Sequence, residues 1–315
     1  MPTKSKQPAP IKINDTTSES IKFFLKHNFE YLIQWEETAR SWDDIEGVHQ
    51  MRVSFRKIRS MFSLFQQALP KSISKYWNEE IRWIGSQLGL ARDLDVFIDE
   101  GLEVIATKLP FVGKDKLLQL AENHRSKAYH KQVCIMLDSK RYTKFKTDFE
   151  QWYEEKAWEK AELNKKNKTH LEMKLLDFSR LILDNQERKV LRKGSQIDRE
   201  SATEMHQLRI ECKKLRYAAE FFQPIFLGME IFIKHLKGIQ DILGILNDVS
   251  VMHDLLELLL GDSKDHELLE FSGAVIGWRT CEYYMQLKNF DSRWDEFTDT
   301  NHPWWKKSAI NYESI

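Results

Sequence analysis

The residues of this sequence best suited to chemistry are cationic, and they occur in two copies of one motif. The first copy is VHQMRVSFRKIRSMFSLF, residues 48–65, and the second is MHQLRIECKKLRYAAEFF, residues 205–222. Each copy places a histidine three residues before an arginine and follows it with further basic residues. Arginine can contact phosphate oxygens through two parallel hydrogen bonds, and lysine supplies a point charge. The chemistry that these residues favour is therefore the binding of a polyanion.

Matching positions in the two copies keep their chemical type. The offset between the copies is 157 residues along the whole motif. The matched pairs are His49 with His206, Arg52 with Arg209, Arg56 with Lys213, Lys57 with Lys214 and Arg59 with Arg216. Identical spacing predicts one cationic helix face that is built twice, on two helices that face each other across a two-fold-like axis.

On a helix, each copy divides into an apolar stripe and a basic stripe. At about 100° per residue, Met51, Phe55 and Ile58 share one face, and the basic residues lie roughly 110° away from it. Val53 forms an apolar patch on the far side of the basic residues. The basic stripes are His49, Arg52, Arg56 and Arg59 in the first copy and His206, Arg209, Lys213 and Arg216 in the second.

Each basic stripe thus lies between two surfaces that must pack. This predicts that the stripes line a cleft, whereas the ordinary alternative for a charged stripe is a solvated face. Like charges in a cleft repel one another unless an anion neutralises them. By the same angles, Lys57 and Lys214 point toward Gln50 and Gln207, so the angles alone predict that both lysines are solvated or at the rim.

A second pair of segments repeats in the same order. RWIGSQLGLARDLDV covers residues 82–96 and KGIQDILGILNDVSV covers residues 237–251, with an offset of 155 residues. Arg82 and Lys237 match and keep their positive charge, so we count both with the anion site. Arg92 matches an uncharged residue, which leaves contact with an anion and pairing with an acid equally open. Two elements that recur in order indicate an internal duplication.

The segment between the two halves adds weaker candidates. Contacts from RSKAYHKQVCIMLDSKRY would come from Arg125, Lys131, Arg141 and Tyr142, although ordinary surface charge explains them equally well. The sequence has no phosphate-binding glycine loop and no GxSxG or HExxH motif. Neither motif histidine has a second ligand at metal spacing on its own face. We therefore expect no catalytic residue, no metal and no cofactor.

These segments must be carried by helices. Only 12 Gly and 7 Pro occur in 315 residues, and helical periodicity continues along most of the chain. The expected helices cover residues 18–38, 46–68, 73–89, 92–108, 114–138, 141–163, 170–190, 201–222, 229–246, 248–260 and 265–289, with a short one near 303–309. The expected fold is all-α, with two antiparallel four-helix bundles related by internal pseudo-two-fold symmetry.

The chain is expected to divide into three segments. Residues 1–17 are polar, which predicts a disordered lead and not a signal peptide. Residues 18–165 and 166–310 are the expected first and second halves of one domain. Lys+Arg and Asp+Glu are both 48, so the formal net charge is +0 and an anion site must come from clustering. The 3 cysteines are widely spaced and no apolar run is long enough to cross a membrane, which favours the cytoplasm and no membrane partner.

At these residues the sequence resembles the CHAD family, the conserved histidine α-helical domain. The resemblance rests on HxxRxxx(R/K)(K/R)xR used twice, on LGxxxD after each copy, and on the central LDSxRY at residues 137–142. It covers essentially residues 18–310, so the chain looks like a stand-alone CHAD protein without an attached β-rich triphosphatase-type domain. The resemblance implies a basic cavity or channel at the junction of two four-helix bundles.

The resemblance also implies a ligand. Members of the family are known to bind inorganic polyphosphate and can localise to polyphosphate granules. Carried over by position, the expected contacts are His49, Arg52, Arg56, Arg59, His206, Arg209, Lys213 and Arg216, with Lys57 and Lys214 also at basic motif positions. We expect a non-catalytic module that holds long-chain polyphosphate in a basic cavity, where sulfate or phosphate ions would also fit, and that follows granules in the cytoplasm.

Three other functions remain open at this point. A metal-dependent phosphoanhydride hydrolase would need acidic ligands near the basic stripe, and Asp93, Asp95 and Asp248 are the nearest candidates. A histidine phosphotransfer bundle would use His49 or His206 as the phosphate acceptor. Nucleic-acid binding is disfavoured because no aromatic stacking platform accompanies the basic residues.

Overall fold

The structure is a computed structural model that describes residues 11–102, 105, 108 and 111–311, without the side chains of residues 100, 246, 247 and 308. The described chain is helical throughout, and its only β contacts are two isolated bridges. The helices are α1 (Thr17–Ile33), α2 (Glu36–Ser41), α3 (Glu46–Leu64), α4 (Lys71–Gln87), α5 (Gly89–Val96), η1 (Phe97–Leu102), α7 (Lys114–Ala128), η2 (Tyr129–Cys134), α8 (Ile135–Asp138), α9 (Lys140–Glu154), η3 (Ala157–Lys160), α10 (Lys165–Glu172), α11 (Leu175–Gly194), α12 (Ala202–Phe222), η4 (Gln223–Ile225), α13 (Met229–Leu260), α14 (His266–Leu287), α15 (Phe290–Thr298), η5 (Pro303–Trp305) and η6 (Lys307–Ala309). The predicted all-α class is confirmed.

The first motif copy forms α3, and its predicted apolar stripe is the buried face. Met51, Phe55 and Ile58 are at most 2% exposed. Helices α1, α4 and α9 complete a four-helix group with α3. Phe55 lies 6.0 Å from Phe145 of α9, and Phe145 lies 6.1 Å from Trp77 of α4, measured between ring centroids. Aromatic packing therefore fixes the rotation of α3 and so the direction of its basic stripe.

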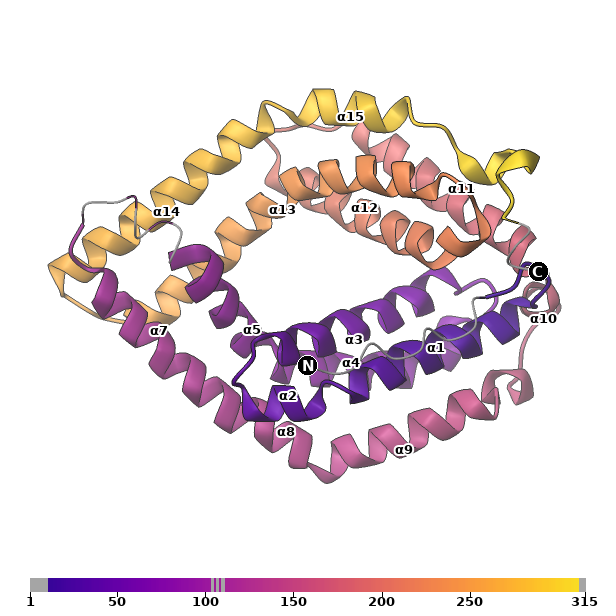
Figure 1. The fold of residues 1–315 in the computed structure, drawn as a ribbon, viewed down its shortest axis with the longest axis horizontal. Helices are drawn as coiled ribbons and strands as arrows, with labels where there is room; N and C mark the ends of the chain where they lie inside the picture. Colours follow the sequence, from indigo (N-terminus) through magenta and orange to yellow (C-terminus); the bar gives the residue numbers. More distant parts are fainter. Residues whose placement is uncertain (1–10, 103–104, 106–107, 109–110, 312–315) are drawn as a thin grey trace.

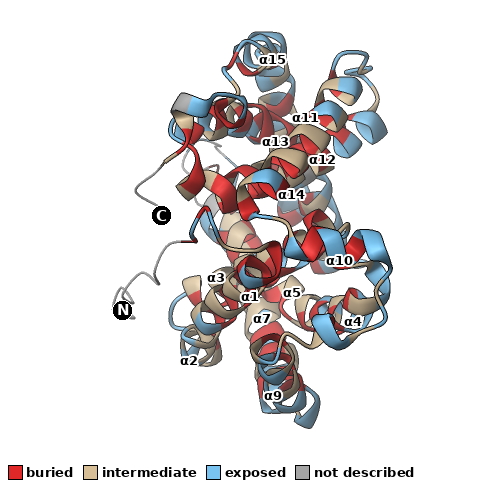
Figure 2. Ribbon diagram, turned by 90° about the vertical axis from the view of Figure 1, so that its right-hand side faces the viewer, coloured by how far each residue is buried: buried red, intermediate tan, exposed pale blue. Residues whose placement is uncertain are grey.

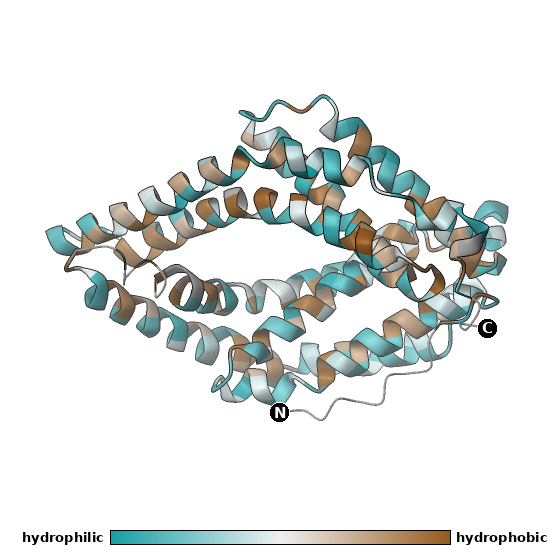
Figure 3. Ribbon diagram, turned by 45° about the horizontal axis from the view of Figure 1, so that its top comes forward, coloured by the Kyte–Doolittle hydropathy of each residue, from teal (hydrophilic) through white to brown (hydrophobic). Residues whose placement is uncertain are grey.

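The second motif copy forms α12, which packs in the same way with α11 and α13, while α15 packs on α13. Ser201 caps α12 by accepting a hydrogen bond from the Glu204 amide at 3.3 Å. Leu208, Cys212 and Leu215 are fully buried. Figure 3 shows hydrophobic and hydrophilic residues mixed along each long helix, as expected for helices with one buried face.

The two four-helix groups meet through the motif helices, because α3 packs directly against α12. Rings from both sides join the groups, with Phe24 lying 4.7 Å from Phe221 and Phe65 lying 6.0 Å from Phe222. Figure 1 shows α12 and α13 above α3 and α5, with α7 and α14 joining the groups at one end and α1, α10 and α11 at the other. The two basic faces are thus brought together at the junction. The two-fold relation between the halves stays a prediction.

Several helix boundaries differ from the sequence predictions. Helix α13 runs unbroken through Gly244, where we expected one helix to end at residue 246 and another to begin at 248. The expected helix 18–38 is divided by a turn at Gln34 and Trp35, which separates α1 from α2. Trp42 then ends α2 with a positive φ of 51°. Helix α15 was not predicted at all, and the 303–309 segment forms short 3₁₀ turns.

The described part of the N-terminal lead is not disordered as predicted. Ile11 and Ile13 are 2% and 6% exposed. The Leu175 amide donates to the Asp15 carbonyl at 2.8 Å, so residues 11–17 are held against the start of α11. Two isoleucines in a polar segment supplied enough apolar surface to pack. Residues 1–10, where the prediction also falls, lie outside the described residues.

Figure 2 shows buried residues on the sides of the helices that face their neighbours and exposed residues on the outer sides of α4, α10 and α15. None of the helices in the described chain has both the length and the apolar character needed to cross a membrane.

Candidate anion-binding site

Two cavities open along the basic face of α3, and Arg56 lines both of them. The first, here called the α3–α13 cavity, has a volume of about 310 Å³ and lies between α3, α5, α13 and α14. The second, called the α3–α4 cavity, has a volume of about 690 Å³ and lies mainly between α3 and α4. Because one side chain belongs to both linings, the two cavities form adjoining parts of one basic site.

The α3–α13 cavity combines basic and apolar walls. Its described charged or titratable lining residues are His49, Arg52, Arg56, Arg92, Asp93, Asp248 and Arg279. Apolar side chains, including Phe97 and Met252, form the rest of the wall. Five cationic or protonatable groups against two carboxylates leave this cavity suited to an anion.

Arg52 is held in place by contacts with α4 and α5. Its Nη1 donates to the Gly85 carbonyl at 3.2 Å, and its Nη2 lies 3.9 Å from Asp93 Oδ1. A Cβ atom at Gly89 would lie 3.3 Å from Nη1 of Arg52, so the glycine leaves room for the guanidinium. Burial lowers the pKa of Arg52, and the charges of Arg56 and Arg92 add to this effect while Asp93 opposes it.

The α3–α4 cavity is the more polar of the two. Its basic lining residues are Arg56, Arg59, Lys71, Lys75, Arg82 and Lys214, with Glu79 as its only acid among the described lining residues. Burial lowers the pKa of Arg59, and the charge of Arg82 lowers it further. The proximity of these like charges is a cost that a bound anion would offset.

Helix α12 brings its own cations close to Arg56. Burial lowers the pKa of Lys213 to about 8, and the nearby charges of Arg209 and Arg56 lower it further. Burial also lowers the pKa of Arg209, where Asp248 opposes the shift and Arg56 contributes to it. The Arg56 guanidinium lies 6.0 Å from the ring centroid of Tyr217 on α12. Cations from both motif copies therefore gather around Arg56.

The two secondary lysines of the motifs lie in different surroundings. Lys214 lines the α3–α4 cavity and forms an ion pair with Glu211 at 3.1 Å. Lys57 instead lines a separate cavity of about 230 Å³ with His27 and Glu220. The angles alone predicted that both lysines are solvated or at the rim of the cleft; in the structure Lys57 is half-buried in its separate cavity and Lys214 is part of the basic site.

Five further predicted residues lie outside the described linings of both cavities, and two of them are Arg209 and Lys213. His206 and Lys237 are exposed on the surface. Arg216 forms an ion pair with Glu220 at 3.3 Å, and its charge still acts on Lys213. The second copy thus contributes Lys214 to a cavity lining, while Arg209 and Lys213 lie close enough for their charges to interact with Arg56.

Of the four weaker candidates in the central segment, three contact acidic side chains of the protein itself, and the fourth is exposed. Arg125 pairs with the fully buried Asp95 at 2.6 Å. Arg141 donates to both carboxylate oxygens of a glutamate on α4, at 2.9 and 3.0 Å. Its guanidinium carbon lies 4.0 Å from the ring centroid of a tryptophan on the same helix. Tyr142 is fully buried and donates to a glutamate at 2.5 Å. Lys131 is exposed and lies outside the described linings of both cavities.

Sequence reasoning missed three basic residues of the cavities. Lys71 and Lys75 lie at the start of α4, and Arg279 lies on α14. The i,i+4 spacing of the two lysines was a signal that could have indicated a shared helix face. Arg279 lies outside both repeated segments, so the repeat could not reveal it.

Of the acidic residues considered for catalysis, Asp93 and Asp248 both line the α3–α13 cavity, whereas Asp95 is fully buried outside its lining. Asp95 is occupied by Arg125 and by the Tyr129 hydroxyl at 2.7 Å. Burial raises the pKa of Asp93, against the opposing charges of Arg52 and Arg92.

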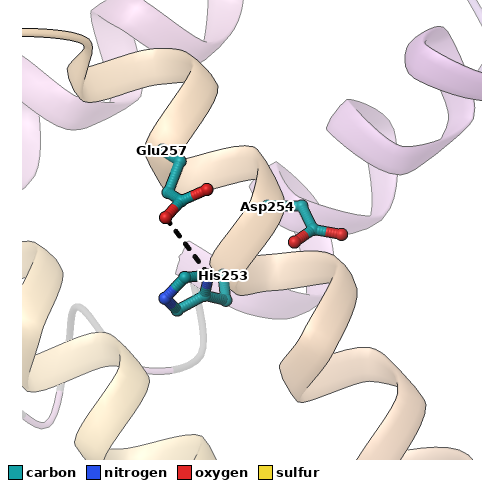
Figure 4. A group of neighbouring side chains, drawn as sticks. All are labelled: His253, Asp254 and Glu257. Atoms are coloured by element: carbon teal, nitrogen blue, oxygen red, sulfur yellow. Dashed lines mark ion pairs between the residues drawn. The ribbon is translucent and has the colours of Figure 1, made fainter.

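A possible metal-ligand group lies elsewhere in the described chain. His253, Asp254 and Glu257 have ligand atoms within 4.8 Å of one another, but all three are exposed on the outer side of α13. Figure 4 shows His253 turned toward Glu257, at 3.8 Å, and Asp254 pointing away from that pair. These residues belong to neither cavity lining, so they offer the basic site no metal-binding carboxylates.

Comparison with known proteins agrees with this fold. The chain has the fold of a CHAD domain from the plant Ricinus communis, with a TM-score of 0.80 and 24% identity over 94% of this chain and 96% of that one. PptA from Streptomyces chartreusis is also similar, with a TM-score of 0.65 and 14% identity over 89% of this chain and 100% of that one.

Curated relatives match a smaller part. Two uncharacterized proteins of Mycobacterium tuberculosis, from strains CDC 1551 and H37Rv, are each 29% identical over 116 residues, which is 36% of this chain. The match spans only 22% of the length of each relative. The profile of the CHAD domain matches residues 24–257. The chain therefore belongs to the CHAD domain family.

Proposed function

We propose that this protein binds inorganic polyphosphate, without catalysis, in the two basic cavities that adjoin at Arg56. The observation that carries the proposal is the meeting of cations from both motif helices around that residue. Membership of the CHAD domain family, which is associated with polyphosphate binding, supports the same ligand.

Electrostatics favour a polymer over a single ion. The cations are distributed over two cavities, so a chain of phosphates can neutralise several of them at once. Phosphates beyond the first bind without a new cost of association. Arginine and lysine side chains also retain their charge at neutral pH, and the depressed pKa of Lys213, about 8, still leaves most of it protonated there.

The direct test removes Arg56, which lines both cavities, together with the neighbouring Lys213. In Arg56→Ala with Lys213→Ala, the affinity for polyphosphate should fall at least about tenfold, because Arg56 lines both cavities and Lys213 lies close to it. Lys57→Ala is the matched control, since it deletes a motif lysine that lies in a separate cavity with Glu220. Calorimetric titration measures both variants, and circular dichroism checks their helix content. Equal losses in the two variants would contradict the assignment.

The non-catalytic part of the proposal has its own test. The described carboxylates in the α3–α13 cavity are Asp93 and Asp248, and Asp93 is near Arg52. A two-metal hydrolytic site would need more carboxylates than these. Incubation with polyphosphate and Mg²⁺ or Mn²⁺ should release no phosphate above a heat-inactivated control. Release that disappears in Asp93→Asn would instead support a hydrolase.

Binding of this kind also provides a means of targeting to polyphosphate granules. A fluorescent fusion of the intact chain should colocalise with granules in the cytoplasm, and the Arg56→Ala and Lys213→Ala variant should be diffuse. RNA should compete with polyphosphate poorly, because binding of single strands relies on several aromatic side chains on which successive bases stack. The described linings contain only one Phe each, Phe97 and Phe62, and no Tyr or Trp.

A further inference from the structure

Helix α14 presents an apolar face to the solvent. Its opposite side packs on α13 and α7, where Phe271 and Val275 are fully buried. On the outer side, Tyr284 and Met285 are 61% and 62% exposed. Trp278 lies at the edge of this side, 37% exposed, with Lys108 Nζ 5.4 Å from its ring centroid. Single exposed apolar residues are common on proteins, but Trp, Tyr and Met together on one helix face are enriched at protein interfaces.

Small residues lie on the same face. A Cβ atom added at Gly273 or at Gly277 would have no neighbour within 4 Å, so the space outside them is open. Ala274 and Cys281 continue the set of small residues. At about 100° per residue, these positions and the bulky ones fall within roughly 140° of the helix circumference. The face, here called the α14 face, thus alternates hollows with projecting side chains.

The α14 face is complementary to itself when two copies of the helix run antiparallel. With a two-fold axis between residues 279 and 280, Tyr284 of one copy lies opposite the hollow between Gly273 and Gly277 of the other. Met285 then lies opposite Ala274 of the second copy, on the other side of the axis line. Small residues allow helix axes to approach to about 8 Å, within which such side chains interdigitate.

The charges at the two ends of the face agree with the same register. Glu270 and Lys288 are both exposed and lie on opposite sides of the proposed axis, at distances that differ by one residue, or about 1.5 Å of helix rise. In the antiparallel arrangement, Glu270 of each copy lies opposite Lys288 of the other, which gives two symmetric ion pairs. A two-fold interface uses one patch twice and must complement itself, and the α14 face meets this requirement in both size and charge.

We propose that two copies of this chain form an antiparallel homodimer through the α14 face. The occupant is a second copy because the hollows, the projecting rings and the opposite charges match under a single two-fold axis. An unrelated partner would not require this internal match. The proposal is independent of the ligand, since the buried side of α14, which includes Arg279, faces the α3–α13 cavity.

The first test fills the hollows. Gly273→Leu with Gly277→Leu should shift the chain from dimer to monomer in sedimentation velocity. The dissociation constant of the dimer should rise more than tenfold, because the leucine side chains fill the hollow that Tyr284 of the other copy would enter. Ile135→Ser is the matched control, since it changes a residue 61% exposed on α8. Circular dichroism reports whether each variant keeps its helix content. A wild-type chain that stays monomeric at high micromolar concentration would overturn the proposal.

The second test reverses the charges and does not change packing. Glu270→Lys alone, or Lys288→Glu alone, places like charges opposite each other and should weaken the dimer about tenfold at low salt. The double exchange of the two charges should restore the wild-type dimer. Failure of the double exchange to restore association, or a dimer indifferent to all three variants, would rule out this register.

Discussion

At the scale of single residues, the site is a set of cations whose repulsion is only partly compensated by nearby acids. Arg52 has Asp93 nearby, and Arg209 interacts with Asp248, whereas Lys213 is surrounded mainly by arginines. Such a residue favours a bound anion because the anion removes a cost that the folded protein already bears. Lys213 is therefore the residue whose protonation should report binding.

Lys213 gives a prediction about pH. Burial and neighbouring arginines lower its pKa to about 8 in the free protein, and a bound polyanion raises that pKa. The contribution of Lys213 to affinity is thus complete below pH 8 and is lost as the pH rises through the pKa of the bound form. Affinity should fall about tenfold between pH 7 and pH 9.

The matched control is Lys213→Arg, which keeps its charge over this range and should flatten the pH profile measured by titration. An unchanged decline in that variant would show that another group titrates.

The lowered pKa of Lys213 also affects the stability of the folded protein. The pKa is below that of an unfolded lysine, so stability of the free protein should rise as the pH increases above about 8.

At the scale of helices, the sequence repeat predicts which faces pack but not what each copy meets. The apolar stripes of α3 and α12 are buried as their periodicity predicted. Lys57 and Lys214 match in sequence, yet one lines a cavity with Glu220 and the other lines the basic site. Different helices lie beside the two copies, and the angular count contains no information about neighbours.

Long-range partners explain why the weaker candidates could not be judged from the sequence. The partner of Arg125 lies 30 residues away and that of Arg141 lies 61 residues away, while Tyr142 bonds a residue 106 positions away. Nothing in the local pattern around LDSxRY names these carboxylates. The predicted break in α13 is wrong for a local reason: a glycine and an aspartate permit a helix to end but do not require it to end.

The matched glycines give a prediction at this scale. Gly89→Ala puts a Cβ atom 3.3 Å from Arg52 Nη1 and should displace the guanidinium, which lowers polyphosphate affinity about two- to fivefold. Gly244→Ala is the control, because its added Cβ atom meets nothing within 4 Å and α13 is helical there. That variant should bind normally and gain about 0.5–1 kcal/mol of stability. Equal binding by both variants would show that Gly89 does not position Arg52.

At the scale of the whole molecule, a balanced chain holds a local concentration of positive charge. The formal net charge is +0, yet the described lining of the α3–α4 cavity has six cationic residues and one acid. The fold achieves this by packing α3 against both α4 and α12, next to the junction of the two helical groups. A protein without excess positive charge attracts polyanions only at the site itself, which favours selective binding over general adhesion.

The most direct test of this account is a titration with polyphosphate chains of graded length at two salt concentrations. The account predicts that affinity rises with chain length until both cavities are filled, and that it falls steeply with salt because counterions are released. Orthophosphate should bind weakly at either salt concentration. Affinity that is independent of chain length, or insensitive to salt, would contradict the claim that one polymer is held across both cavities.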